Sequence, residues 1–218
     1  MRHRLPRVCL SLLMCFVAAG ATAPPAALAQ VPPRCQPPAL SASGKERNIF
    51  TPEQESDLGD AIAEHVQRHY ILIEEEEVTG RLRAIGAALV KQIPPTDLRF
   101  QFFLVDLPDV NAFAMPGGRI YVSRKLVAFA ESEDELAGVL AHEIGHLAAR
   151  QTAIDMTRIF KKVLGVTKVT DRRDIFEKYN QLVENTARKP GAFGNGEEEK
   201  EQLEADRIGL YAMVAAGY

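Results

Sequence analysis

Apolar residues in the first part of the chain recur at helical intervals. Behind the acidic run 74–77 the intervals are four, three and four residues, with the apolar positions at Val78, Leu82, Ile85 and Leu89. This spacing predicts an amphipathic helix that ends at the proline pair 94–95. An earlier helix is expected from Thr51 to about His69, because Thr51 and Gln54 match the capping box of a helix start.

The hydrophobic period changes after residue 98. Segment 99–105 is aromatic and β-prone, and segment 120–122 has the same character, so each predicts a short strand. Ser132, with Glu135 at the capping-box position, then begins a helix that continues to about Arg150. The hydrophobic period thus changes from helical to strand-like and back to helical, which indicates a fold with both helices and strands.

The C-terminal half is predicted to be mostly helical. Residues 152–182 have a less regular helical pattern, the Gly-rich segment 189–196 interrupts it, and a last helix runs from the acidic residues 197–199 to about Ala216. The chain is therefore expected to form an α+β domain that is dominated by helices and contains a small β-sheet.

The composition is that of a soluble globular protein, with 46% hydrophobic and 25% charged residues. Residues 1–29 are predicted to be a signal peptide, because an arginine-rich start precedes an apolar stretch and a small-residue site at 27–29. Residues 30–48 are expected to form a flexible Pro-rich leader, and residues 49–218 the folded domain. This order of segments predicts a protein that is exported to the periplasm or cell envelope.

The net charge disfavours one class of function. Cleavage after Ala29 removes three of the 26 basic residues, which leaves 23 against 29 acidic ones and a formal charge of −6. Nucleic-acid-binding domains usually carry a basic stripe, so no nucleic-acid partner is expected. Cys35 remains as a single cysteine after cleavage and can form no internal disulfide.

The segment 142–146 carries the candidate chemistry. His142 and His146 lie four residues apart in a predicted helix, so both imidazoles project from one face and can bind one zinc ion. Glu143 is rotated towards the zinc-bound water and can take its proton as general base, while zinc polarises the scissile carbonyl. The pattern and its apolar surroundings predict the active-site helix of a zinc protease. A catalytic zinc also needs a third protein ligand.

Three further segments resemble metallopeptidase family 48. They are the stretch 202–209, the segment 111–122 with its Pro-Gly-Gly turn, and the closing residues 215–218. That family includes CAAX prenyl proteases, mitochondrial quality-control proteases and periplasmic outer-membrane-assembly proteases. The chain is identified as a periplasmic-type member, which implies a gluzincin-like zincin domain with one zinc ion per chain.

The resemblance also implies roles for single residues. His142 and His146 would bind zinc, Glu143 would be the general base, and Asp206 would match a catalytic aspartate that is sometimes assigned as proton donor. Segment 120–122 would be the edge strand to which a substrate peptide adds. The alternative for that strand is a plain hairpin that packs on the core.

One position departs from the family pattern. The third zinc ligand of the family is a glutamate four residues before the aspartate, and this chain has Gln202 there. Zinc could bind weakly through the Gln202 amide oxygen, a small helix rotation could bring in Glu201 or Glu204, or the protein could have lost proteolysis. The chain also stops at Tyr218, earlier than the family usually does, as either a fragment or a short version.

Two hypotheses of function follow. The first is a zinc metalloendopeptidase that cleaves unfolded or misassembled envelope proteins, with peripheral association with a membrane or an envelope assembly machinery. The second is a non-proteolytic chaperone or assembly factor that keeps the protease fold with a weakened zinc site. Residues 152–196 are either a mobile segment over the cleft or further helical core.

Overall fold

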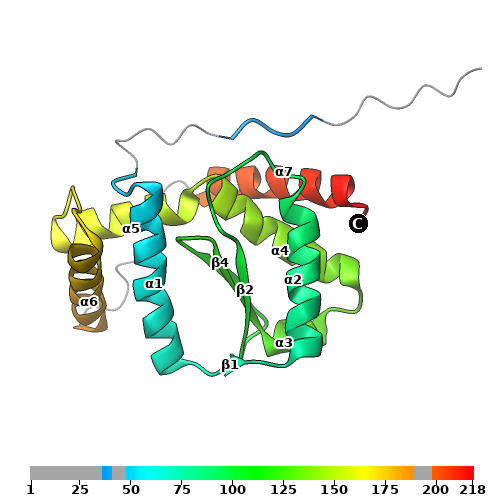
Figure 1. The fold of residues 1–218 in the computed structure, drawn as a ribbon, viewed down its shortest axis with the longest axis horizontal. Coiled ribbons are helices and arrows are strands. Elements are labelled where there is room, and N and C mark those ends of the chain that lie inside the picture. Colours follow the sequence, from blue (N-terminus) through cyan, green and yellow to red (C-terminus); the bar gives the residue numbers. More distant parts are fainter. Residues whose placement is uncertain (1–35, 41–47, 189–197) are drawn as a thin grey trace, which may run out of the picture. The chain divides into compact units, whose positions relative to one another are not determined.

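The computed structural model describes residues 36–40, 48–188 and 198–218 (Figure 1). The predicted signal peptide, Cys35, most of the predicted leader and the Gly-rich segment 189–196 lie outside the described residues. Within the described part of the leader, Leu40 packs against a hydrophobic core cluster.

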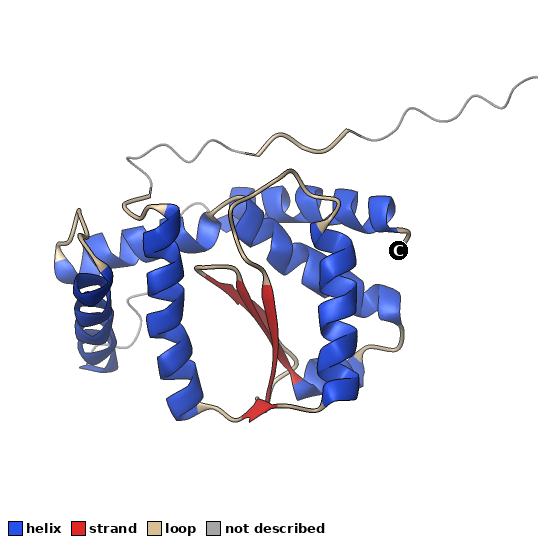
Figure 2. Ribbon diagram, in the orientation of Figure 1, coloured by secondary structure: helices blue, strands red, loops and turns tan. Residues whose placement is uncertain are grey.

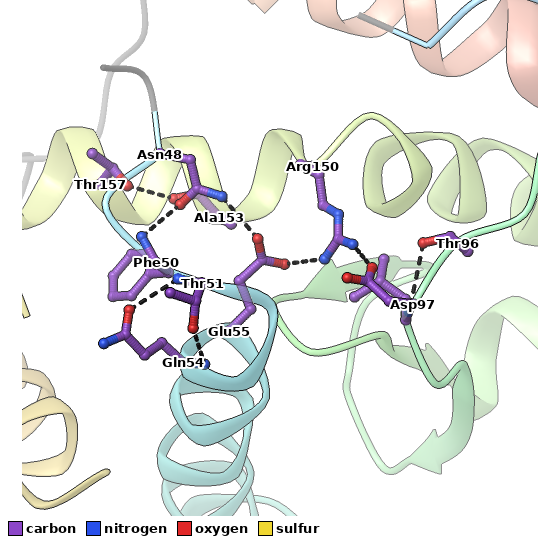
Figure 3. Close-up of polar contacts among 11 residues, drawn as sticks. Asn48, Phe50, Thr51, Gln54, Glu55, Thr96, Asp97, Arg150, Ala153 and Thr157 are labelled. Carbon is purple, nitrogen blue, oxygen red and sulfur yellow. Dashed lines mark hydrogen bonds and ion pairs between the residues drawn. The ribbon is translucent and has the colours of Figure 1, made fainter. Parts of the chain in front are cut away.

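The first two helices form where the sequence predicts them. Helix α1 spans Pro52–His69 and helix α2 spans Glu76–Val90. The capping box of α1 is complete, because Gln54 N–H donates to Thr51 Oγ1 and Thr51 N–H donates to Gln54 Oε1 (Figure 3). The buried residues of α2 include Leu82, Ile85 and Leu89, which confirms the predicted apolar face.

The four described strands form one mixed sheet. They are β1 Leu72–Ile73, β2 Gln101–Val105, β3 Ala112–Met115 and β4 Arg119–Ser123, in the spatial order β1-β2-β4-β3. Strands β2 and β4 are parallel, and the other two pairs are antiparallel. The strands predicted at 99–105 and 120–122 are confirmed, whereas β1 and β3 were not predicted.

The prediction that 120–122 is an edge strand is wrong. Strand β4 lies between β2 and β3 and is buried along its whole length. The Pro-Gly-Gly turn connects β3 to β4, with Gly117 and Gly118 both at positive φ. The two strands form an antiparallel pair, in which β3 lies on the outer side of β4. Strand β3 therefore occupies this edge of the sheet, and β4 is a central strand.

Both faces of the sheet are covered. Residues of β2 and β4 that alternate along the strands pack with α2 and α4 on one face: Phe102, Leu104, Ile120 and Val122. On the other face Tyr121 stacks between Phe103 and Phe113, under the apolar residues of α1. Figure 2 shows α1 and α2 on either side of the strands. This double burial explains why β4 has apolar residues at consecutive positions.

The C-terminal half consists of helices, as predicted. After the short α3, Arg124–Phe129, come α4 Glu133–Ala148, α5 Gln151–Ile159, a π-helical turn Phe160–Leu164, α6 Arg172–Arg188 and α7 Glu198–Ala216. Ser132 caps α4, but the Glu135 carboxylate accepts from Glu131 N–H rather than from the cap residue. None of the described helices is long and apolar enough to cross a membrane.

Candidate active site

Helix α4 carries the predicted motif into a polar cavity of about 350 Å³. The walls of the cavity come from four elements: Ala112, Phe113 and Ala114 of β3, His142, Glu143 and His146 of α4, Thr152 and Asp155 of α5, and Glu201 and Gln202 of α7. Residues separated by about ninety positions in the sequence thus surround one space. The motif therefore lines a cavity that β3 borders.

The two histidines direct one ring nitrogen each towards a common point. Nε2 of His142 lies 3.0 Å from Nε2 of His146. Two nitrogen ligands of one tetrahedral metal ion, each at ~2.05 Å, would stand ~3.3 Å apart. The opposite ring nitrogens contact oxygen atoms, with His142 Nδ1 at 2.8 Å from Asp206 Oδ1 and His146 Nδ1 at 2.5 Å from Gln151 Oε1. This donor set fits a metal ion, because such oxygen partners are typical of metal-binding histidines.

Close packing of two helices brings Asp206 to His142. A β-carbon added at Gly145 would lie 2.4 Å from the carbonyl oxygen of Ala205, and one added at Gly209 would lie 2.8 Å from that of Ala141. Both distances are shorter than van der Waals contact, so only glycine permits this separation of α4 and α7. The glycine inside the His-Glu-x-x-His motif is therefore a packing residue.

Glu143 is the acidic group that the motif helix α4 contributes to the cavity. Burial raises its pKa to about 7, against smaller opposite effects from His142 and from a hydrogen bond with the Ala114 backbone. Burial also lowers the pKa of His146, which favours its neutral form. A carboxyl group that can both accept and release a proton near pH 7 suits a general base.

The predicted third ligand has a defined place. Gln202 lines the cavity together with His146, and it acts to raise the pKa of that imidazole, against the larger effect of burial. Of the two alternatives, Glu201 accepts from Arg158 Nη2 at 2.7 Å, and Glu204 accepts from Gln151 Nε2 at 3.0 Å. Among the described residues, no three His, Cys, Asp or Glu side chains converge on one metal position. At the position predicted for the third ligand, α7 therefore presents an amide to the cavity.

Sequence reasoning missed two residues at this site. Gln151 contacts His146, and Arg158 holds Glu201. Neither residue belongs to the His-Glu-x-x-His motif or to the α7 motif. Both lie on α5, which Arg150 separates from α4 with a left-handed backbone conformation at φ 59° and ψ 20°. The sequence predicts a helix up to about Arg150 and so gives no sign of this turn.

The fold and the paired histidines define the class of His-Glu-x-x-His metallopeptidase domains. The chain belongs to peptidase family M48, because the model of that family matches residues 76–218. This match covers strands β2, β3 and β4, the motif helix α4 and the last helix α7. The resemblance inferred from the sequence motifs is confirmed, as is the α+β fold.

Named relatives come from bacteria and mitochondria. The beta-barrel assembly-enhancing protease of Escherichia coli K12 is 32% identical over 100 residues, which cover 46% of this chain and 20% of that protein. The Yersinia pestis protein of the same name is 27% identical over 172 residues, with 76% and 35% covered. Mitochondrial metalloendopeptidase OMA1 of Arabidopsis thaliana is 32% identical over 126 residues, with 56% and 24% covered. The chain thus spans well under half the length of these relatives.

Proposed function

We propose that this protein is a zinc-dependent metalloendopeptidase that cleaves unfolded or misassembled proteins of the cell envelope. The observation that carries the proposal is the convergence of His142 Nε2 and His146 Nε2 at 3.0 Å, next to the buried Glu143. A zinc ion held there would polarise the scissile carbonyl and acidify a water molecule. Gln202 is the proposed third ligand, because it lines the same cavity as the two histidines and stands at the position of the family's third ligand.

The side chains of the chain itself divide the remaining work. Glu143 takes a proton from the attacking water, and its raised pKa allows it to return that proton to the leaving amine. Asp206, which the resemblance matches to a catalytic aspartate sometimes assigned as proton donor, contacts His142 Nδ1, and we propose that it orients this imidazole.

Strand β3 is the proposed binding edge for substrate. It borders the cavity through Ala112 and Ala114, and a substrate in extended conformation could pair with its free side. This replaces the earlier assignment to segment 120–122, which is central in the sheet. Recognition through backbone groups suits unfolded chains, because it requires an extended segment and little side-chain specificity.

The substrate class and the location rest on other observations. Two of the relatives are called beta-barrel assembly-enhancing proteases, and this chain begins with an export-type sequence at residues 1–29. We therefore propose export to the periplasm or envelope. Peripheral association with a membrane or with an assembly machinery is the proposed context of action.

Metal removal tests this function directly. The purified protein is expected to contain close to one zinc ion per chain by elemental analysis and to cleave casein, an unfolded substrate. A zinc chelator should abolish cleavage, and added zinc should restore it, because the proposed chemistry needs the metal. Cleavage that continues after complete removal of zinc would contradict the proposal.

A second candidate function is a non-proteolytic chaperone or assembly factor. Gln202 favours it, because a neutral amide binds a hard divalent cation more weakly than a carboxylate does. Such a protein would use the β3 edge to hold unfolded chains without cutting them. Prevention of aggregation in the absence of zinc and of cleavage is the behaviour that identifies it.

The substitution Gln202→Glu tests whether position 202 is a zinc-ligand position and whether its neutral amide limits cleavage. A carboxylate at this position is expected to tighten zinc binding tenfold or more, measured by competition with a chromophoric chelator, and to raise casein cleavage. The control is Leu203→Glu, which adds the same charge at the neighbouring, exposed position. Equal zinc affinity in both variants and the parent would show that Gln202 is not a ligand position.

A further inference from the structure

Gln151 is a buried polar side chain that lies outside the recognised motif. It is the first residue of α5, it contacts His146 five positions earlier, and only 3% of it is exposed. Burying an amide costs free energy unless its polar atoms are hydrogen-bonded. The partners of Gln151 therefore determine which way its amide group faces.

Two acceptors fix the amide orientation. The Gln151 nitrogen Nε2 lies 3.1 Å from the backbone oxygen of Glu201 and 3.0 Å from Glu204 Oε2. A carbonyl and an ionised carboxylate only accept hydrogen bonds, so the group that faces them must be the NH₂. The oxygen Oε1 then faces His146 Nδ1, and an amide oxygen cannot donate.

We propose that Gln151 is a positioning residue that holds the His146 imidazole in its Nδ1–H tautomer. Nδ1 must carry the hydrogen, because Oε1 of Gln151 can only accept at 2.5 Å. The lone pair then resides on Nε2, which faces His142 Nε2 at 3.0 Å. In the other tautomer the lone pairs of His146 Nδ1 and Gln151 Oε1 would face each other at 2.5 Å, and an N–H would point at the place where a metal ion would bind.

The turn before α5 delivers Gln151 to this position. Arg150 is the one non-glycine residue with positive φ in the described ranges, and this conformation interrupts the helix between α4 and α5. Its guanidinium contacts Glu55 of α1 at 2.6 Å and also pairs with Asp97 (Figure 3). Two carboxylates from other parts of the fold thus hold the turn, and the turn places Gln151 under His146.

The two histidines receive different partners for a physical reason. Asp206, which bonds to His142, is mostly exposed, so water screens its charge. Gln151 is buried next to Glu201 and Glu204, where another carboxylate would add like charge in a low dielectric. A neutral amide orients His146 without that cost. Gln151 also links α7 to α4, because its three hydrogen bonds join the two helices.

The tautomer can be measured without metal or substrate. In metal-free, ¹⁵N-labelled full-length protein at about pH 8, where a histidine is neutral, long-range ¹H–¹⁵N correlations distinguish the two ring nitrogens. The His146 ring is expected to show the Nδ1–H pattern. Gln151→Met, which is unbranched and of similar length, removes the acceptor and should shift the ring towards the Nε2–H form. Gln151→Glu keeps an acceptor and should retain the Nδ1–H pattern.

Zinc affinity provides a second readout, and this arm alone rests on the proposed function. Gln151→Met is expected to weaken zinc binding 10–100-fold, the effect of losing an outer hydrogen bond to a ligand. If Gln151→Met does not fold, the parent protein still decides, since an Nε2–H pattern at His146 would overturn the proposal. An unchanged ring pattern in a folded Gln151→Met variant would overturn it too. A correct tautomer in a protein that binds no zinc would reject the proposed function and leave this inference standing.

Discussion

Replacement of Glu143 by glutamine is expected to lower casein cleavage roughly 10²–10⁴-fold, the range typical for loss of a general base. The amide has nearly the same shape and can still accept the hydrogen bond from the Ala114 backbone, but it cannot take a proton from water. Zinc content should stay unchanged, because Glu143 is not among the proposed ligands. Initial rates of cleavage and elemental analysis measure the two quantities.

The control for this variant is Asp134→Asn, which removes one acidic charge from the exposed first turn of the same helix. Its cleavage rate should match that of the parent protein. If Glu143→Gln cleaved casein as fast as Asp134→Asn, the assignment of Glu143 as general base would be wrong. Equal zinc content in all three proteins excludes loss of metal as the cause of any difference.

The stability of Glu143→Gln should depend on pH in a predictable direction. Burial raises the folded-state pKa of Glu143 from its ordinary value of 4.5 to about 7, so the folded protein favours the protonated form. The contribution of this group is complete below pH 4.5 and is lost as pH rises through 7, because ionisation then opposes folding. In metal-free protein at pH 8 the variant is expected to be more stable than the parent by about 3 kcal/mol, which corresponds to the difference between the two pKa values.

Urea unfolding of the metal-free proteins at about pH 4 and about pH 8 tests this expectation. At the lower pH the glutamate is protonated in both states, so the parent and variant should differ little. An equal difference at the two pH values, or a parent that is more stable at the higher one, would contradict the proposed effect of burial. The same data show whether the variant is folded in the cleavage assay.

Replacement of Arg150 by leucine is the second large effect, expected to lower the free energy of unfolding by roughly 3–5 kcal/mol. The Glu55 side chain is 4% exposed and would lose its charge partner, keeping only the hydrogen bond from Asn48 Nδ2 (Figure 3). A buried carboxylate without a partner is costly because the surroundings solvate it poorly. Urea unfolding measures the loss.

Two companion variants separate charge from backbone conformation. Arg150→Gly also removes the ion pairs but fits the left-handed turn, so it should be about 1 kcal/mol more stable than Arg150→Leu. Adding Glu55→Gln to Arg150→Leu should recover part of the loss, because the unpaired charge is then gone.

The matched control is Arg83→Leu, which breaks the exposed pair of Arg83 with Glu76 and should cost less than about 1 kcal/mol. If Arg83→Leu and Arg150→Leu lost similar free energies of unfolding, burial of Glu55 would not increase the cost of losing its charge partner.

The sequence alone determined the elements that depend on local interactions. The capping box at Thr51 and the apolar spacing of α2 predict helices because caps and helical periodicity act within a few residues. The pair His142 and His146 was predictable for the same reason, since one helical turn brings their rings together. Family membership also followed from short motifs, and the family match confirms it.

Only the tertiary structure decided which residues surround that helix. The central place of β4 depends on the pairing of β3 with it, and the contact of Asp206 with His142 depends on the close packing of α4 and α7. Gln151 reaches His146 because two distant carboxylates hold Arg150 in a left-handed turn. These contacts join residues far apart in the chain, so no local pattern encodes them. The sequence thus specified the chemical groups, and long-range packing specified their partners.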